Sequence, residues 1–213
     1  RLADAKFFYK EDLQQPLEMY VKDLKGVTFQ DKLGTMYEKT LRITHLAESL
    51  ALKADLSKDQ VEDAKRAAYL AKADLVTQTV VEFTSLQGIM GGYYAQASGE
   101  NDVVAQAVAE HYKPRSQADS LPEKSVGKVV ALADKLDSIC GIFAIDEAPT
   151  GSSDPYQVRR QAIGIINILL ELTNINLADS INESLSAYTE SVDFDFENVH
   201  QEICDIFIGR RPV

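Results

Sequence analysis

Residues 67–94 read AAYLAKADLVTQTVVEFTSLQGIMGGYY, and they predict a helix that is apolar on nearly every side. At about 100° per residue, Ala68, Val76 and Val80 share one face, while Leu70 covers part of the opposite face. A helix that is apolar all round is usually buried at the centre of a domain. We therefore expect one long central helix in an all-helical fold.

Lys72 lies in the middle of the main apolar face of this helix, one turn from Ala68 and one turn from Val76. A buried ammonium group requires a partner of opposite charge. Alternatively, its aliphatic stem follows the apolar surface and the ammonium group reaches solvent. The sequence leaves both possibilities open.

The rest of the pattern predicts further helices and contains no β-hairpin signal. Ser57 and Gln60 form a capping-box pattern at the start of the long helix, and Gly88, Gly91 and Gly92 permit a sharp turn at its end. The expected helices cover residues 1–12, 16–26, 35–53, 57–86, 89–97, 102–111, 125–144, 154–172, 177–188 and 199–208, with an irregular or extended segment at 27–34. We expect a helical bundle over residues 1–172 and additional helices over 173–213, which would lead into the next unit of a longer protein.

The composition is that of a globular chain with a buried core. The chain has 213 residues, of which 45% are hydrophobic, and this length suits one moderate domain or two small ones. No apolar run is long enough for a transmembrane helix, and no signal peptide is visible. Cys140 and Cys204 lie among apolar residues, as reduced packing thiols do. We expect a cytoplasmic protein without membrane contact, and the missing initial Met suggests a fragment.

The net charge of −11 argues against a general nucleic-acid-binding surface, and DNA is not an expected partner. An RNA partner would have to contact local basic residues. The candidates are Lys113, Arg115, Arg159, Arg160, Arg210 and Arg211. The polar turn at residues 149–155 leads into a helix with two arginines near its first turn, which is typical of a phosphate site. In the alternative interpretation, these arginines pair with Asp146 and Glu147.

No nucleotide-binding or nucleophile motif is present, because the sequence lacks GxxxxGK[ST], GxGxxG after a strand, and CxxC. Of the three histidines, His45 is expected to be structural and His200 has no assigned role. His111 ends a predicted helix, where a cation would interact favourably with the helix dipole. Contact with a nucleotide or RNA is the alternative for His111.

Four blocks of the sequence resemble the beta subunits of the bacterial two-subunit glycine-tRNA ligases. They are KADLVTQTVVEFTSLQGIMGGYYA (72–95), ALADKLDSICGIFAIDEAPTGSSDPYQVRRQAIGIINIL (131–169), RLADAKFFYKEDLQQPLE (1–18) and DKLGTMYEKTLRITHLAESLA (31–51). The blocks are in the family's order, and the resemblance covers most of residues 1–170.

The resemblance implies a degenerate form of the HD domain, a helical phosphohydrolase core whose active members hold a metal with histidine and aspartate side chains. Lys39 stands at the position of the first histidine, and Ala71 and Lys72 replace the His-Asp pair. Asp134 alone matches a metal ligand. Because ammonium groups cannot coordinate a metal, we expect no metal here. If these positions converge, Lys72 and Asp134 form an ion pair in the former metal pocket.

The function implied by the resemblance is ATP-dependent attachment of glycine to tRNA(Gly), together with the alpha subunit. In this family the alpha subunit holds the adenylation site, so this fragment is expected to bind no cofactor and to be inactive alone. Two alternatives stand beside this interpretation. One is a metal-dependent phosphohydrolase of the HD type that acts on nucleotides, and the other is a protein-interaction domain without RNA contact.

Overall fold

The structure is a computed structural model that describes residues 2–209. It confirms the all-α prediction, with one small antiparallel sheet as the only strands in the described range. The helices are α1 (Leu2–Asp12), α2 (Glu18–Val21), α3 (Met36–Lys53), α4 (Lys58–Leu70), α5 (Gln78–Glu82), α6 (Ile89–Ala97), α7 (Asp102–Glu110), α8 (Ser125–Ala144), α9 (Val158–Leu169), α10 (Leu177–Ser186) and α11 (Phe196–Phe207). The 3₁₀ helices are η1 (Lys22–Gly26), η2 (Ala73–Val76) and η3 (Thr84–Leu86), and the strands are β1 (Thr28–Gln30) and β2 (Gly34–Thr35).

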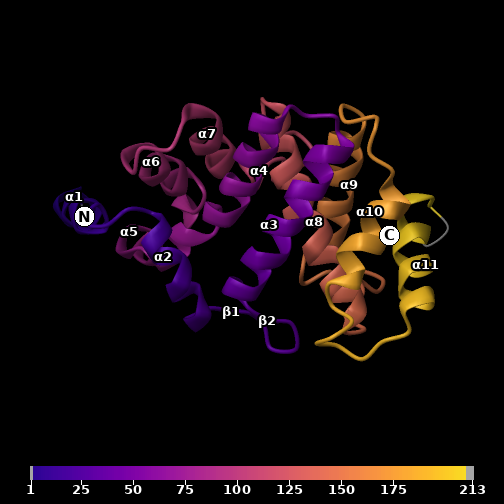
Figure 1. Ribbon diagram of the computed structural model, residues 1–213. Helices are drawn as coiled ribbons and strands as arrows, with labels where there is room; N and C mark the ends of the chain where they lie inside the picture. Colours follow the sequence, from indigo (N-terminus) through magenta and orange to yellow (C-terminus); the bar gives the residue numbers. More distant parts are fainter. Residues whose placement is uncertain (1, 210–213) are drawn as a thin grey trace.

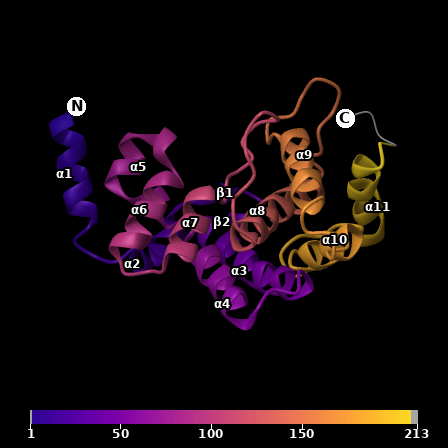
Figure 2. The ribbon, with the colours of Figure 1, turned by 90° about the horizontal axis from the view of Figure 1, so that it is seen from above.

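The central helix of the fold is α8, which contacts α3, α4, α7, α9, α10 and α11. Figure 1 shows α3 and α4 on one side of it and α9 to α11 on the other. Nearly every residue of α8 is buried, including the charged residues Asp134, Lys135 and Asp137. An apolar helix without a polar face needs partners all round, and α8 has them. Figure 2 shows α1 and α11 at opposite ends of the molecule.

The predicted continuous helix over residues 57–86 is wrong. The capping box at its start is present, because Ser57 Oγ accepts from the Gln60 backbone at 3.3 Å and the Gln60 side chain accepts from the Ser57 backbone at 3.0 Å. However, α4 ends at Leu70, and the chain then passes through η2, α5 and η3 before α6 begins. The apolar character of this region therefore reflects burial of several short elements, not one central helix.

Buried polar side chains explain this break. Asp74 Oδ2 accepts from the backbone N–H groups of Gly88 and Gly91 at 2.6 and 2.9 Å, and thus caps α6. Asp12, the last residue of α1, accepts from the N–H groups of Gln78 and Thr79 at 2.8 and 2.9 Å, and thus caps α5. Such side chains satisfy the unpaired N–H groups of short helices, so each can begin in a buried position.

The small sheet was not predicted. β1 and β2 pair antiparallel, and Gly34 has a φ of +85°, a conformation that favours glycine. Strands of two or three residues are too short for an alternating pattern to be visible in the sequence. Thr35 follows directly and forms a capping box with Glu38 at the start of α3.

The other predicted helices match the observed ones within about two residues at each end, with three exceptions. The helix predicted at 16–26 is α2 followed by η1, α9 covers Val158–Leu169 where 154–172 was predicted, and α11 begins at Phe196 where 199 was predicted. Residues from both 1–172 and 173–213 contribute to one buried apolar cluster, and the boundary at 172 stays a prediction. Cys140 is buried, Cys204 is half-buried, and both are free thiols. Among the described residues, no helix combines the length and apolar character that a membrane span requires.

Candidate anion-binding cavity

A buried cluster of charges lies where α3, the end of α4 and α8 meet. Lys72 Nζ lies 2.9 Å from Asp134 Oδ2, and Lys39 Nζ lies 3.2 Å from Asp134 Oδ1. Lys39 Nζ also lies 2.9 Å from Asp137 Oδ2, and Arg42 Nε donates to Asp137 Oδ1 at 2.7 Å. The expected Lys72–Asp134 ion pair is therefore present, and Lys72 does not reach solvent, because only 2% of it is exposed.

The local helix geometry assembles this cluster. Asp134 and Asp137 are three residues apart on α8, so both carboxylates point to the same side of the helix. Lys72 follows the end of α4, where its ammonium group lies 3.9 Å from the centre of the Tyr112 ring. The ring adds a favourable cation–π contact to the ion pair.

The ion pairs dominate the electrostatics of the cluster. Burial alone would raise the pKa of the Asp134 carboxyl, but Lys72 and Lys39 outweigh burial and hold it well below its usual range. Burial acts on Asp137 in the same way, and there Lys39 and Arg42 lower the pKa. Both carboxylates are thus ionised at neutral pH.

His111 is a neutral side chain, which corrects the prediction of a cation at the end of α7. It is completely buried, and its Nδ1 lies 2.6 Å from the Val108 carbonyl oxygen. Burial and the neighbouring Lys72 lower the pKa of His111 to about 3. His200 lies on the surface, with its Nε2 3.0 Å from the Ala178 carbonyl oxygen.

The residues of this cluster do not suit a metal ion. Lys39 and Lys72 place ammonium groups against both oxygens of Asp134, and Ala71 is a buried side chain without a donor atom. An ammonium group has no lone pair for a metal and repels a cation. Within residues 2–209, no group of three or more His, Cys, Asp or Glu side chains is arranged to hold a metal.

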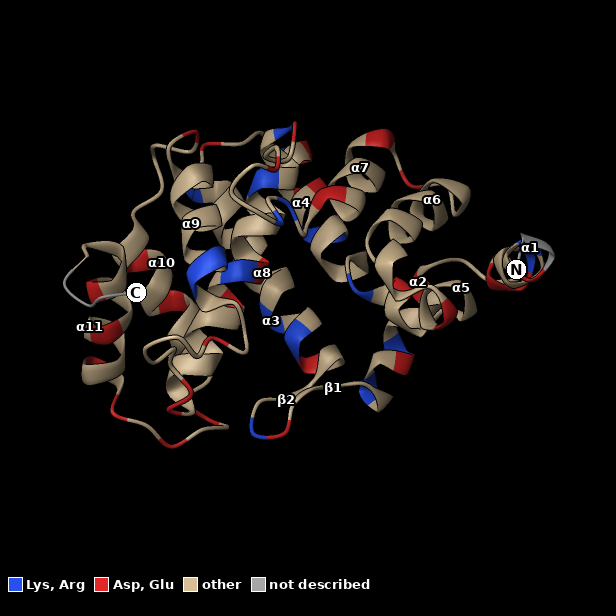
Figure 3. Cartoon of the chain, turned by 180° about the vertical axis from the view of Figure 1, so that it is seen from behind, with Lys and Arg blue, Asp and Glu red and all other residues tan. Residues whose placement is uncertain are grey.

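A cavity of about 420 Å³ opens beside the charge cluster. Its lining residues come from β1, from α3, from Lys72 and Gln87, from the loop after α7, from α8, and from the start of α9. They are Phe29, Met36, Lys39, Lys72, Gln87, Tyr112, Pro114, Arg115, Asp134, Lys135, Ser138, Gln157, Arg160 and Gln161. Figure 3 shows Lys and Arg residues on α3 and beside α8 near the middle of the molecule, whereas the charged residues of α11 are Asp and Glu.

Three cations of this lining form no ion pair with any carboxylate of the described chain. Lys135 Nζ donates to the Tyr112 carbonyl oxygen at 3.2 Å. Arg115 Nη2 donates to the Gln87 carbonyl oxygen at 3.1 Å, and Arg160 Nη1 donates to Gln157 Oε1 at 2.9 Å. Burial lowers the pKa of Lys135 to about 8, so its side chain is still mostly protonated at pH 7. All three side chains line the cavity and have further donors for a ligand.

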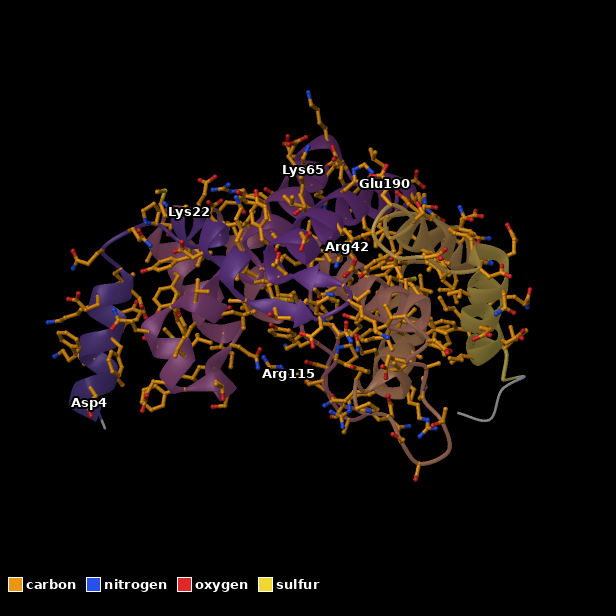
Figure 4. All side chains as sticks on the ribbon, turned by 90° about the horizontal axis from the view of Figure 1, so that it is seen from below. Asp4, Lys22, Arg42, Lys65, Arg115 and Glu190 are labelled. Carbon is orange, nitrogen blue, oxygen red and sulfur yellow. The ribbon has the colours of Figure 1, made fainter. Side chains whose placement is uncertain are left out.

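Of the six predicted RNA-binding residues, four lie in the described range, and two of these four lie at this cavity. Arg115 and Arg160 come together there although they are 45 positions apart in the chain. Lys113 instead pairs with Glu110 at 3.0 Å, and Arg159 donates to the Gly151 carbonyl oxygen, which stabilises the turn before α9. Figure 4 shows Arg42 among packed side chains and Arg115 near the edge of the molecule.

The alternative in which Arg159 and Arg160 pair with Asp146 and Glu147 is not what the structure shows, because their hydrogen bonds go to Gly151 and Gln157. Asp154 caps the start of α9, since its carboxylate accepts from the Val158 and Arg159 backbone at 2.8 and 3.1 Å. Arg210 and Arg211 lie outside the described residues.

Lys135 and Asp137 were not predicted as members of the site. Lys135 carried the same signal as Lys72, namely a lysine inside a helix that is apolar on almost all sides. Asp137 carried a weaker one, because it follows Asp134 by one helical turn and could share its partners.

Comparison with known proteins identifies the family. The family described as glycyl-tRNA synthetase beta subunit matches residues 1–212. The chain is similar to the glycine-tRNA ligase beta subunit of Clostridioides difficile (strain 630), with 50% identity over 211 residues, 99% of this chain and 30% of that protein. It is 43% identical over 216 residues to that of Bacillus subtilis (strain 168), covering 96% of this chain and 32% of that protein. The chain thus spans about 30% of the length of these relatives, and it belongs to the glycyl-tRNA synthetase beta subunit family.

Proposed function

We propose that this chain is a non-catalytic part of a glycine-tRNA ligase beta subunit. In this proposal it supports ATP-dependent glycylation of tRNA(Gly), in the cytoplasm, through scaffold contacts, contacts with the alpha subunit and contacts with tRNA. ATP is used by the complete enzyme and not bound by this chain. Membership of the family supports the proposal.

The observation that supports tRNA contact is the pair of unneutralised arginines at the cavity. Arg115 and Arg160 carry charges that no carboxylate of the described chain neutralises. Arginine binds phosphate oxygens through several parallel donors, and such contacts position a nucleic acid without reading its sequence. A local basic site of this kind reconciles RNA binding with a net charge of −11.

The Lys39, Lys72 and Asp134 cluster supports the non-catalytic part of the proposal. These side chains are engaged with one another, and the two lysines do not suit a metal. Because an HD-type phosphohydrolase depends on a metal at these positions, the cluster favours a binding role over hydrolysis.

The test uses the full-length beta subunit together with the alpha subunit. An Arg115→Ala/Arg160→Ala double variant should bind tRNA(Gly) more weakly and raise the KM for tRNA in glycylation. Because two phosphate contacts are lost, the slope of log Kobs against log salt should become shallower by roughly 1.5. A Lys22→Ala/Lys58→Ala double variant removes the same charge from exposed positions away from the cavity lining. It should leave the tRNA affinity, the KM for tRNA and the salt slope unchanged.

Equal effects in the two double variants would mean that only net charge matters, which would refute a specific contact. Unchanged tRNA binding in both would favour a protein-interaction domain.

A further inference from the structure

We propose that the cavity binds a terminal phosphate group, the phosphate monoester of a nucleotide, with Lys135 at its floor and Arg115 and Arg160 at its mouth. The inference goes beyond general tRNA contact, and it rests on the proposed function only in the choice of RNA as one carrier of the phosphate. The same chemical group can come from the 5′ end of an RNA or from a free nucleotide.

The charge balance of the cavity favours a dianion. Asp134 is the only carboxylate among the lining residues that the structure describes, and it is already shared by Lys39 and Lys72. Asp119, in the same loop as Arg115, accepts from the Arg115 backbone N–H at 2.7 Å and not from its side chain. Lys135 and the two arginines therefore leave a positive surplus greater than one. A phosphate monoester carries about −1.5 to −2 at pH 7, whereas a phosphodiester carries only one negative charge.

The depth of Lys135 favours the end of a chain over its middle. Only 4% of Lys135 is exposed, and one of its three N–H donors is used by the Tyr112 carbonyl oxygen. A buried ammonium group without a carboxylate partner is costly, and an anion that enters the cavity would relieve this cost. A phosphodiester within a strand would require the strand to enter and leave the cavity, while a terminal phosphate needs only to enter.

The fold holds Lys135 in this position. A Cβ atom at Gly164 on α9 would lie 2.9 Å from Lys135 Cε, so the absence of a side chain there makes room for the lysine stem between α8 and α9. The ammonium group is thus directed by packing before any ligand arrives, which lowers the entropic cost of binding.

The rest of the lining suits the remainder of a nucleotide. Gln87, Gln161 and Ser138 offer neutral donors and acceptors, and Phe29 and Met36 offer apolar surface. The volume of about 420 Å³ lies within the range of small-ligand sites. A site with a few charged groups, several amides and apolar walls is typical of a ligand of this size.

The experiment measures binding to the full-length beta subunit with its alpha subunit, using three probes. They are a tRNA(Gly) transcript with a 5′-monophosphate, the same transcript with a 5′-hydroxyl, and AMP. We expect the 5′-phosphate or AMP to bind in a Lys135-dependent manner. Lys135→Met should reduce that binding about tenfold or more, because it removes one charge-assisted contact.

Lys128→Met is the matched control, since Lys128 lies two turns earlier on α8 and pairs with Glu171 outside the cavity lining. Should Lys135→Met fail to fold, Gly164→Ala provides a second variant, which displaces the Lys135 stem and keeps its charge. It should weaken the same binding.

The outcomes separate the sources of the phosphate and the two proposals. Tighter binding of the 5′-phosphate transcript, lost in Lys135→Met and kept in Lys128→Met, supports the inference with an RNA end as the source. Lys135-dependent binding of AMP without discrimination between transcripts supports it with a free nucleotide as the source. Equal binding of both transcripts without Lys135-dependent binding of AMP overturns it, even where salt-sensitive tRNA binding through Arg115 and Arg160 persists. Phosphate discrimination that survives in a folded Lys135→Met variant overturns it as well.

Discussion

Replacing Asp134 by Asn should lower the free energy of unfolding by about 3 to 5 kcal/mol, because the change leaves Lys72 buried without a counter-ion. The Lys72–Asp134 pair is 2.9 Å apart, and an effective dielectric constant of about 20 gives a gross attraction of about 6 kcal/mol. Removing water from the two ions costs several kcal/mol each, so the intact pair contributes little net stability. Removing only the Asp134 charge, however, leaves the desolvation cost of the Lys72 ammonium group uncompensated.

The partner variant Lys72→Met should cost less, about 1 to 3 kcal/mol, since Asp134 keeps Lys39 at 3.2 Å as a counter-ion. The double variant Lys72→Met/Asp134→Asn removes the unpaired ammonium group. Its loss should therefore be smaller than the sum of the single losses by about 2 kcal/mol. Urea unfolding of the 213-residue chain, followed by circular dichroism at 222 nm, measures all four free energies.

Lys128→Met is the control here too, because its partner Glu171 is half-exposed and a surface pair contributes about 1 kcal/mol or less. The Asp134 pKa is lowered from 3.8, so its stabilising contribution is fully present above that pH and is lost only as the pH falls below it. The loss of unfolding free energy in each variant should therefore be the same at pH 5 and pH 7. Losses that add within about 0.5 kcal/mol would refute the coupling of Lys72 to Asp134.

Three further predictions concern single positions. Burial raises the pKa of Asp74 from 3.8 to about 6, so the folded state binds the extra proton between these values and Asp74 destabilises the fold by up to roughly 3 kcal/mol as the pH rises through that window. The thermal unfolding temperature of Asp74→Asn should depend less on pH between 4 and 6 than that of the parent chain. The same pH dependence in both chains would contradict the raised pKa of Asp74. Gly92→Ala should destabilise the chain by about 1 to 3 kcal/mol, because its Cβ would lie 2.6 Å from the Ala109 Cβ between α6 and α7. Urea unfolding measures this, and a neutral result would mean that the two helices can separate freely. Ser57→Ala should cost about 1 kcal/mol through loss of the capping box of α4, whereas Ser57→Asp should keep most of the stability in the same assay.

Helices defined by local signals were predictable from the sequence. The predicted bounds of 125–144 coincide with α8, and Ser57 caps α4 as the capping-box pattern indicates. These signals act within one or two turns of the chain, so no knowledge of the tertiary structure is needed.

The breaks within 57–86 were not predictable, because their causes are distant in the sequence. Asp12 caps α5 from 66 positions away, and Asp74 caps α6 from 14 and 17 positions away. Periodicity reports only that residues are buried, and a set of short helices buries the same residues as one long helix.

The candidate site was predictable in part. A buried ammonium group needs a partner, and the resemblance to the HD domain indicated Asp134, which the structure places 2.9 Å from Lys72. Physical reasoning on one helix could not indicate that Arg115, Lys135 and Arg160 line a common cavity, since they meet only through the packing of α8 against α9 and the loop after α7.

The contacts of Asp12 also affect the order in which parts of the chain unfold. Its buried carboxylate accepts from two amides of α5 and from the Tyr94 hydroxyl at 2.7 Å, while Tyr9 of α1 stacks on the Tyr94 ring. When α1 detaches, α5 loses the two hydrogen bonds from Asp12 at its start, and α6 loses the Asp12 and Tyr9 contacts of Tyr94 in the same event. Residues 2–12 and 78–97 should therefore exchange their amide hydrogens as one cooperative unit, at a lower free energy than α8, whose protection requires unfolding of the whole bundle.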